Sequence, residues 1–222
     1  MSGDVELSTL YARRFDAADE AFKAAVWRIL WRRVFSRYIG QGDVLVDVGG
    51  GYCELTNVAT ASRKIVVDLN PAARERAAPG VEVHTTSAED MSFLADGQAN
   101  VVFASNFLEH LPDKAALTRT AREVRRVLAP GGRFIAMGPN VRLMPGTYWD
   151  WYDHHVPLSD RSLVELLVTT GFELEEVVPR FVPATTQRGP RWPFLVTAYL
   201  ALRPFSSWLA GKQFLVIARK PA

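Results

Sequence analysis

Cysteine and net charge are both scarce in this chain, and each shortage excludes a class of protein. The single cysteine, Cys53, cannot form a disulfide within the chain. The 26 basic and 24 acidic side chains leave a formal charge of +2, far below the excess of Lys and Arg that phosphate neutralisation favours. We therefore expect no nucleic-acid partner.

The sequence also lacks an apolar run long enough to span a bilayer. Its most apolar late stretch, residues 192–202, is interrupted by Arg203 and Pro204, whereas a spanning helix needs about 20 residues. The opening residues MSGDVELS do not have the basic-then-apolar order of a secretory signal. These features predict a cytoplasmic protein that is not transmembrane.

Short β-branched runs alternate with helical patterns along most of the chain. The runs that predict strands are 44–48, 65–68, 81–85, 101–105, 133–137, 172–178 and 213–218. The helical pattern of residues 115–128 ends at Pro130-Gly131-Gly132, and the periodicity of residues 7–39 predicts two helices before the sheet. Residues 179–212 are too many for a hairpin turn and predict a helical insertion. We expect an α/β fold: a doubly wound, mostly parallel seven-stranded sheet with N-terminal helices and a helical insertion before the last strand.

A glycine-rich turn follows the first predicted strand. Asp47-Val48 leads into Gly49-Gly50-Gly51, where the absence of side chains lets backbone amides approach a ligand. The same glycines could serve turn geometry alone. Asp68, at the end of the next strand, stands 17 residues after Gly51, close to the spacing at which a carboxylate reaches a bound ribose.

The residues after the turn argue against a dinucleotide. A nicotinamide-dependent oxidoreductase needs G-x-G-x-x-G with a pyrophosphate above the helix N-terminus, but Gly51 is followed by Tyr52, Cys53 and Glu54. The carboxylate of Glu54 would repel a pyrophosphate there. The pattern therefore argues against a nicotinamide cofactor.

At these motifs the chain resembles the class I S-adenosylmethionine-dependent methyltransferases, whose first motif reads D-x-G-x-G-x-G and whose second strand ends in an acidic ribose ligand. Cys53 replaces the third glycine of that motif. The likeness extends through Ser87-Ala88-Glu89-Asp90, similar to the family's adenine-contacting turn, and through residues 100–113 and 122–137. The resemblance implies one methyltransferase domain over residues 1–222: a helical cap at 1–40, a cofactor core at 41–140, and an acceptor-side loop, insertion and last strands at 141–222.

The same resemblance implies S-adenosylmethionine as cofactor. Tyr11 and Arg14, in the predicted N-terminal helices, could reach its carboxylate, although helical spacing is equally typical of core packing. The cofactor-binding residues implied are Tyr11, Arg14, Asp47, Gly49, Gly50, Gly51, Asp68, Leu69, Ser87, Ala88, Glu89, Ser105 and Asn106.

Histidines next to carboxylates mark the acceptor side. Asn106-x-x-Glu109-His110 resembles the E-x-x-E-H metal-binding pattern of ubiquinone-pathway O-methyltransferases and small-RNA 2′-O-methyltransferases, with asparagine replacing the first glutamate. This likeness implies a magnesium site at Glu109 and His110. The alternative is that both residues only start a helix or satisfy nearby backbone groups.

A second histidine motif follows the fifth predicted strand of the core. Asp153-His154 matches a D-H dipeptide of the small-RNA enzymes, and the aromatic and acidic residues 148–155 suit a polar ligand held against rings. An imidazole titrating near neutrality can accept a hydroxyl proton, so we expect His154 or His155 as general base, with Asp153 or Asp150 orienting the ring. The alternative is that the histidine and aromatic rings only pack this loop against the sheet.

These features predict an O-methyltransferase that acts on a hydroxyl of a small polar acceptor, most simply a saccharide, with a histidine base and magnesium assistance. Quinone, phenolic or lipid-like acceptors remain open, as does a catalytically degenerate protein that binds the cofactor as a partner of another. The basic and aromatic insertion 179–212 could cover the acceptor, form a homodimer or lie on a membrane surface.

Overall fold

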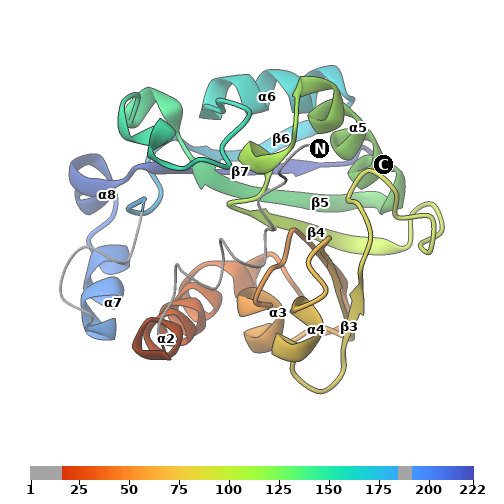
Figure 1. Cartoon of the computed structure of the whole chain (residues 1–222), viewed down its shortest axis with the longest axis horizontal. Coiled ribbons are helices and arrows are strands. Elements are labelled where there is room, and N and C mark those ends of the chain that lie inside the picture. Colours follow the sequence, from red (N-terminus) through yellow and green to blue (C-terminus); the bar gives the residue numbers. More distant parts are fainter. Residues whose placement is uncertain (1–16, 185–191) are drawn as a thin grey trace, which may run out of the picture.

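The computed structural model describes residues 17–184 and 192–222, which form one seven-stranded sheet flanked by helices (Figure 1). The strands are β1 (Val44–Val48), β2 (Arg63–Val67), β3 (Val81–His84), β4 (Ala99–Ser105), β5 (Leu128–Pro139), β6 (Glu173–Val178) and β7 (Gln213–Arg219). Their order is β3-β2-β1-β4-β5-β7-β6, with β7 antiparallel to both of its neighbours. The predicted fold class is confirmed.

Helices cover both faces of the sheet. They are α2 (Ala17–Arg33), α3 (Glu54–Val58), α4 (Ala73–Arg76), α5 (Lys114–Val127), α6 (Asp160–Thr169), α7 (Pro193–Ala201) and α8 (Phe205–Ala210), and the short 3₁₀ turns are η1 (Phe35–Arg37), η2 (Leu108–His110), η3 (Val141–Leu143) and η4 (Thr147–Asp150). Figure 1 shows α5 and α6 on one side of the sheet and α2 and α3 on the other. Of the helices within the described ranges, none is long and apolar enough to cross a bilayer.

Two apolar cores explain why the strands are hydrophobic on both faces. Val46, Val102 and Phe134 pack with residues of α5 and α6, whereas Leu45 and Phe103 pack with residues of α2 and η1. Strands buried on both faces read as continuous apolar runs because neither set of alternating side chains reaches water.

Local signals set the limits of the covering helices. Asp113 caps α5 by accepting a hydrogen bond from the amide of Ala116 at 2.7 Å. Ser159 and Ser162 form a capping box at the start of α6, as their spacing predicts. These caps fix where each helix meets the sheet edge.

The junction between α5 and β5 differs from the prediction. The Pro130-Gly131-Gly132 turn was expected to separate helix and strand, but Leu128 already pairs with Ala99, and the glycines form an irregularity inside β5. Gly131 has a φ of 76°, which favours glycine at this bend.

The insertion before the last strand is helical, as predicted. α7 and α8 lie between β6 and β7 in the chain. The segment that leaves β6 and the segment that enters β7 both lie at the sheet edge that carries the end of β5. There, Asn140 donates its backbone N–H to the carbonyl of Lys212. The insertion therefore starts and ends at the same edge as the loops described next.

Candidate active site

A strained turn connects β1 to α3. Gly49, Gly51 and Cys53 all adopt positive φ, at 66°, 48° and 59°. A Cβ added to Gly49 would lie 2.2 Å from ring atoms of Phe107, whereas one added to Gly51 would meet no atom closer than 4.0 Å. Gly49 therefore lets the segment after β4 pack onto the turn, and Gly51 leaves open space above its backbone.

Cys53, which replaces the third glycine of the D-x-G-x-G-x-G motif, adopts a left-handed conformation. Its side chain is fully buried and packs with Val66 and Ala73. Burial raises the pKa of the thiol to about 12, so Cys53 acts here as a neutral apolar side chain. The turn thus accommodates a side chain by directing it inward.

The carboxylate of Asp68 holds the glycine turn by accepting hydrogen bonds from backbone amides. One carboxylate oxygen accepts the N–H of Gly51 at 2.8 Å, and the other accepts the N–H of Asn70 at 2.7 Å. The structure therefore brings Asp68 next to the glycine turn, as the spacing of 17 residues predicts. Each carboxylate oxygen retains acceptor capacity for a ligand hydroxyl.

Three carboxyl groups, those of Asp47, Glu54 and Asp68, lie near one another in this region. Burial raises the pKa of Asp47 well above its ordinary value, and the nearby charges of Glu54 and Asp68 raise it further. Burial also raises the pKa of Glu54, while Lys23, whose Nζ lies 3.9 Å from its carboxylate, lowers it. Such a group suits a cation, because a positive ligand relieves the repulsion among the acids.

The remaining predicted cofactor residues lie at or just after the carboxyl ends of β2, β3 and β4, or lie outside the described ranges. Leu69 is 63% exposed, and the Ser87 hydroxyl accepts the amide of Glu89 in a tight turn after β3. At the end of β4, Asn106 has a φ of 48°, and its side-chain amide donates to the Ser105 hydroxyl. Tyr11 and Arg14 fall in residues 1–16, outside the described part of the chain.

A cavity of about 610 Å³ opens between α2 and α3, next to the turn. Tyr52, Glu54, Lys23 and Trp31 are among its lining residues. Trp27, the neighbouring tryptophan of α2, instead packs against Phe35 and Phe103 in the core.

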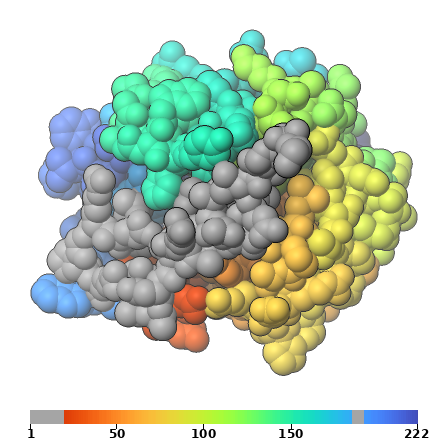
Figure 2. Space-filling model, in the orientation of Figure 1, coloured from red at the N-terminus to blue at the C-terminus, as the bar shows by residue number. Residues whose placement is uncertain are grey.

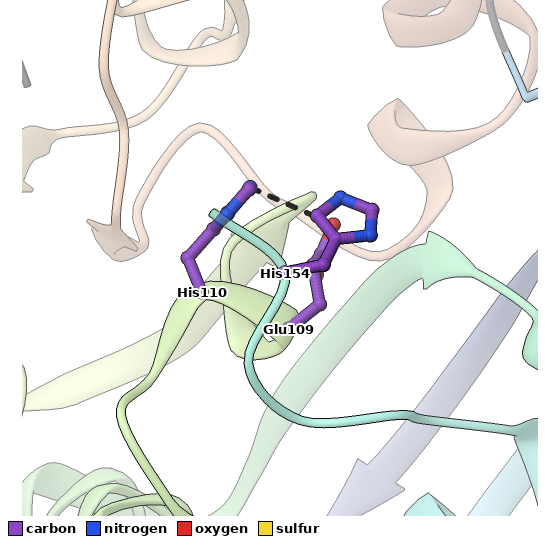
Figure 3. Close-up of side chains that lie close together, drawn as sticks. All are labelled: Glu109, His110 and His154. Atoms are coloured by element: carbon purple, nitrogen blue, oxygen red, sulfur yellow. Dashed lines mark ion pairs between the residues drawn. The ribbon is translucent and has the colours of Figure 1, made fainter. Parts of the chain in front are cut away.

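Acidic and imidazole side chains converge on the acceptor side (Figure 3). Glu109 and His110 belong to η2, and His154 comes from the loop after η4. Each offers one ligand atom, and these atoms lie within 4.8 Å of one another. We call Glu109, His110 and His154 the acceptor-side cluster.

Asp153 orients His110, which lies 43 positions earlier in the chain. Nδ1 of His110 lies 2.8 Å from the carbonyl oxygen of Asp153 and 3.4 Å from its carboxylate. Since a carbonyl only accepts, Nδ1 must carry the proton, and a neutral His110 keeps a lone pair on Nε2. Nε2 lies 3.9 Å from the Glu109 carboxylate, on the cluster side of the ring.

The two candidate base histidines have different surroundings. The His154 ring is half-buried, 5.0 Å from the ring of His110 and 4.7 Å from that of Tyr148. The His155 side chain is exposed, and so is that of Asp150. The structure thus places His154 in the cluster and His155 outside it.

Main-chain hydrogen bonds hold the cluster together. The carbonyl of Glu109 accepts the amides of His155 and Val156 at 2.9 and 3.1 Å. The buried hydroxyl of Tyr148 donates to the carbonyl of Val156 at 2.6 Å and accepts the amide of Leu158 at 3.2 Å. These bonds join the segment after β4 to the loop after β5.

The Glu109 carboxylate is almost completely buried. Burial raises its pKa, and His110 opposes part of that rise. A cation bound by the cluster would stabilise the ionised form, so the residues present fit a divalent metal. Two imidazoles and one carboxylate form a softer donor set than magnesium prefers and are typical of transition-metal or zinc sites.

The sequence did not identify the Glu109–His110–His154 group as one unit. His154 follows His110 by 44 residues in the chain. The available signal was positional: both histidines follow adjacent parallel strands, whose carboxyl ends meet at one sheet edge.

Comparisons with known proteins show which proteins this chain resembles. Residues 46–136 match the family described as a methyltransferase domain. A "Probable S-adenosylmethionine-dependent methyltransferase" of Mycolicibacterium smegmatis is 30% identical over 169 residues, which cover 74% of this chain and 64% of that protein. A demethylmenaquinone methyltransferase of Symbiobacterium thermophilum is 28% identical over 72% of this chain and 69% of its own length.

A solved structure resembles the whole chain. It is a chain of the complex between the Haloferax volcanii Trm112 methyltransferase activator and a methyltransferase, with a TM-score of 0.69, 18% identity and full coverage of both chains. At that identity the likeness concerns the fold alone.

Proposed function

Because this chain belongs to the class I S-adenosylmethionine-dependent methyltransferase family, we propose that it transfers a methyl group from S-adenosylmethionine to a hydroxyl of a small acceptor. The convergence of Glu109, His110 and His154 at the sheet edge that carries the glycine turn supports this proposal. Phe107 contacts Gly49, and Glu109 and His110 of the cluster follow Phe107 closely in the chain.

The glycine turn and Asp68 fit the cofactor. When bound, S-adenosylmethionine supplies a methyl group on a positively charged sulfur. When ionised, the carboxylates of Asp47, Glu54 and Asp68 would stabilise that positive charge, and Asp68 retains acceptor capacity for ribose hydroxyls. Gly51 leaves space for a ligand against the backbone.

The cluster would remove the acceptor proton. As methyl transfer forms the acceptor C–O bond and breaks the S–C bond, the hydroxyl proton must pass to a base. Neutral His110 has its proton fixed on Nδ1 by Asp153, so Nε2 can take the acceptor proton, and Asp153 then stabilises the imidazolium. His154, one of the two histidines predicted as the base, lies beside it.

Glu109, His110 and His154 could instead hold a divalent cation. Bound there, a cation would lower the pKa of an acceptor hydroxyl, and Asp153 would orient the ligand His110 through its second ring nitrogen. The magnesium predicted from the sequence belongs to this alternative, although the donor set favours manganese or zinc.

The acceptor class that the loop composition favours is a saccharide. Trp149 and Tyr152 are exposed rings in the segment that carries Asp153 and His154, where they could stack on a sugar. Methylation of a quinone ring carbon is the second candidate, supported by the similarity to the demethylmenaquinone methyltransferase.

Turnover assays on single variants test the proton-transfer proposal. We expect His110→Ala and His154→Ala to lower turnover by about 10²–10⁴-fold with cofactor affinity unchanged, whereas His155→Ala, the matched control, stays close to the wild type. Full activity in both cluster variants would refute the proposal. Turnover that is lost on chelation and restored by manganese or zinc would favour the metal alternative.

The acceptor type is tested with ¹³C-methyl-labelled cofactor and panels of saccharides and quinones. The ¹³C chemical shift of the product distinguishes an O-methyl from a C-methyl group. An aromatic C-methyl product would replace the hydroxyl assignment with the quinone candidate.

A further inference from the structure

The helical insertion has an apolar outer surface that no other described part of the chain covers. On α7 and α8 and just before them, large side chains are 58–69% exposed: Trp192, Phe194, Leu202, Phe205, Trp208 and Leu209. In Figure 2 the blue segments of the insertion lie at the left margin of the molecule. We call these six side chains the insertion patch.

The inner face of α7 is already used for packing. Val196 and Leu200 pack against the core that α2 and Phe181 share, and the Tyr199 hydroxyl donates to the carbonyl of Phe181. α7 is therefore apolar on its inner and outer faces alike. A helix of this kind normally has a partner on each face, so the outer face calls for an apolar partner.

Charge in this part of the sequence identifies the partner. Residues 179–212 contain five basic side chains, and all 24 Asp and Glu residues of the chain lie outside this segment. Among the basic residues in the described ranges, Arg203 lies over the ring of Phe181, and Arg180 approaches the carbonyls of Trp208 and Gly211. A segment of apolar and aromatic side chains whose only charged residues are cations matches a surface that is apolar inside and anionic at its rim.

We propose that the insertion patch docks the protein onto the surface of a bilayer that contains anionic lipids. α7 and α8 have nine and six residues, far fewer than the roughly 20 needed to span a bilayer, so they would lie in the interface. Tryptophans favour this depth because their rings combine an apolar body with a polar N–H.

Charge also argues against a second copy of the chain as the partner. In a two-fold interface the same patch meets itself, which would bring two all-basic segments together without a single acidic residue from either. A bilayer rich in anionic headgroups neutralises these cations instead. Docking would also bring the sheet edge with the glycine turn and the acceptor-side cluster near the membrane, since the insertion starts and ends at that edge.

Vesicle binding of the full chain tests the proposal. We expect co-sedimentation with mixed phosphatidylcholine–phosphatidylglycerol vesicles, binding at least about tenfold weaker to pure phosphatidylcholine vesicles, and weakening with salt. Phe205→Glu combined with Trp208→Glu should lower the affinity about a hundredfold, because two apolar anchors are replaced by charges. Brominated lipids should quench tryptophan fluorescence in the wild type more than in this double variant.

Val168→Glu is the matched control, since Val168 is a 53% exposed apolar residue on α6, outside the patch. It should bind vesicles like the wild type, and thermal melting checks that every variant is folded. Failure of the wild type to bind anionic vesicles, or equal loss in the control variant, would refute the proposal. A dimer in light scattering that the double variant dissociates, without vesicle binding, would assign the patch to a second copy.

Discussion

Replacing Gly49 by alanine tests how the glycine turn and the segment after β4 are joined. A Cβ at this position would lie 2.2 Å from the Phe107 ring, and the residue has a φ of 66°. The left-handed conformation costs about 1–2 kcal/mol for a residue with a Cβ. Forcing the ring aside adds about 1–3 kcal/mol. We expect Gly49→Ala to lower the free energy of unfolding by roughly 2–5 kcal/mol.

Two further variants separate the contributions. Gly131→Ala carries the conformational cost alone, because φ is 76° there and no atom lies within 4 Å of the added Cβ. Combining Gly49→Ala with Phe107→Ala removes the clash, so the double variant should cost less than the sum of its single variants by about 1–3 kcal/mol. Urea denaturation followed by tryptophan fluorescence measures the wild type, the three single variants Gly49→Ala, Phe107→Ala and Gly131→Ala, and the double variant. A Gly49→Ala cost equal to that of Gly131→Ala, or a coupling energy near zero, would refute the predicted contact.

Three other substitutions test separate parts of the structure. Asp68→Asn should weaken calorimetric S-adenosylmethionine binding by about 10–100-fold, because a charged acceptor is lost, and unchanged affinity would contradict its assignment. Glu109 has a raised pKa in the fold, so its stabilising contribution is present at low pH and is lost as pH rises through that pKa. The free energy of unfolding of Glu109→Gln should therefore rise relative to that of the wild type between acidic and neutral pH. A difference that stays constant with pH would be inconsistent with a buried carboxyl. Asp113→Ala removes the cap of α5 and should cost about 1 kcal/mol in denaturation, whereas a neutral result would mean that the amide of Ala116 finds another acceptor.

The sequence predicted the sheet well because its signals are local. The β-branched run at residues 44–48 and the glycines after it indicate a buried parallel strand and its turn without knowledge of any distant contact. The start of β5 was wrong because pairing of Leu128 with Ala99 depends on a neighbour almost 30 positions away in the chain. Long-range pairing of this kind leaves little trace in local composition.

The candidate site also combines a feature that the sequence predicts with one that depends on distant contacts. The nearness of Asp68 to Gly51 follows from a common spacing between two adjacent strands. In contrast, the sequence did not predict the hydrogen bond that the backbone carbonyl of Asp153 accepts from His110, because this bond forms only where the loop folds back onto η2. Which of two adjacent histidines is turned inward depends on that fold of the loop, and neither periodicity nor composition records it.

The hydrogen bonds that the Glu109 carbonyl accepts from His155 and Val156 have an evolutionary consequence. Because every amino acid except proline offers the same amide, the positions of this loop can change their side chains while its path is preserved. Single substitutions at the ends of β4 and β5 could therefore change the reaction that a relative catalyses, while the main chain that carries these residues keeps its path.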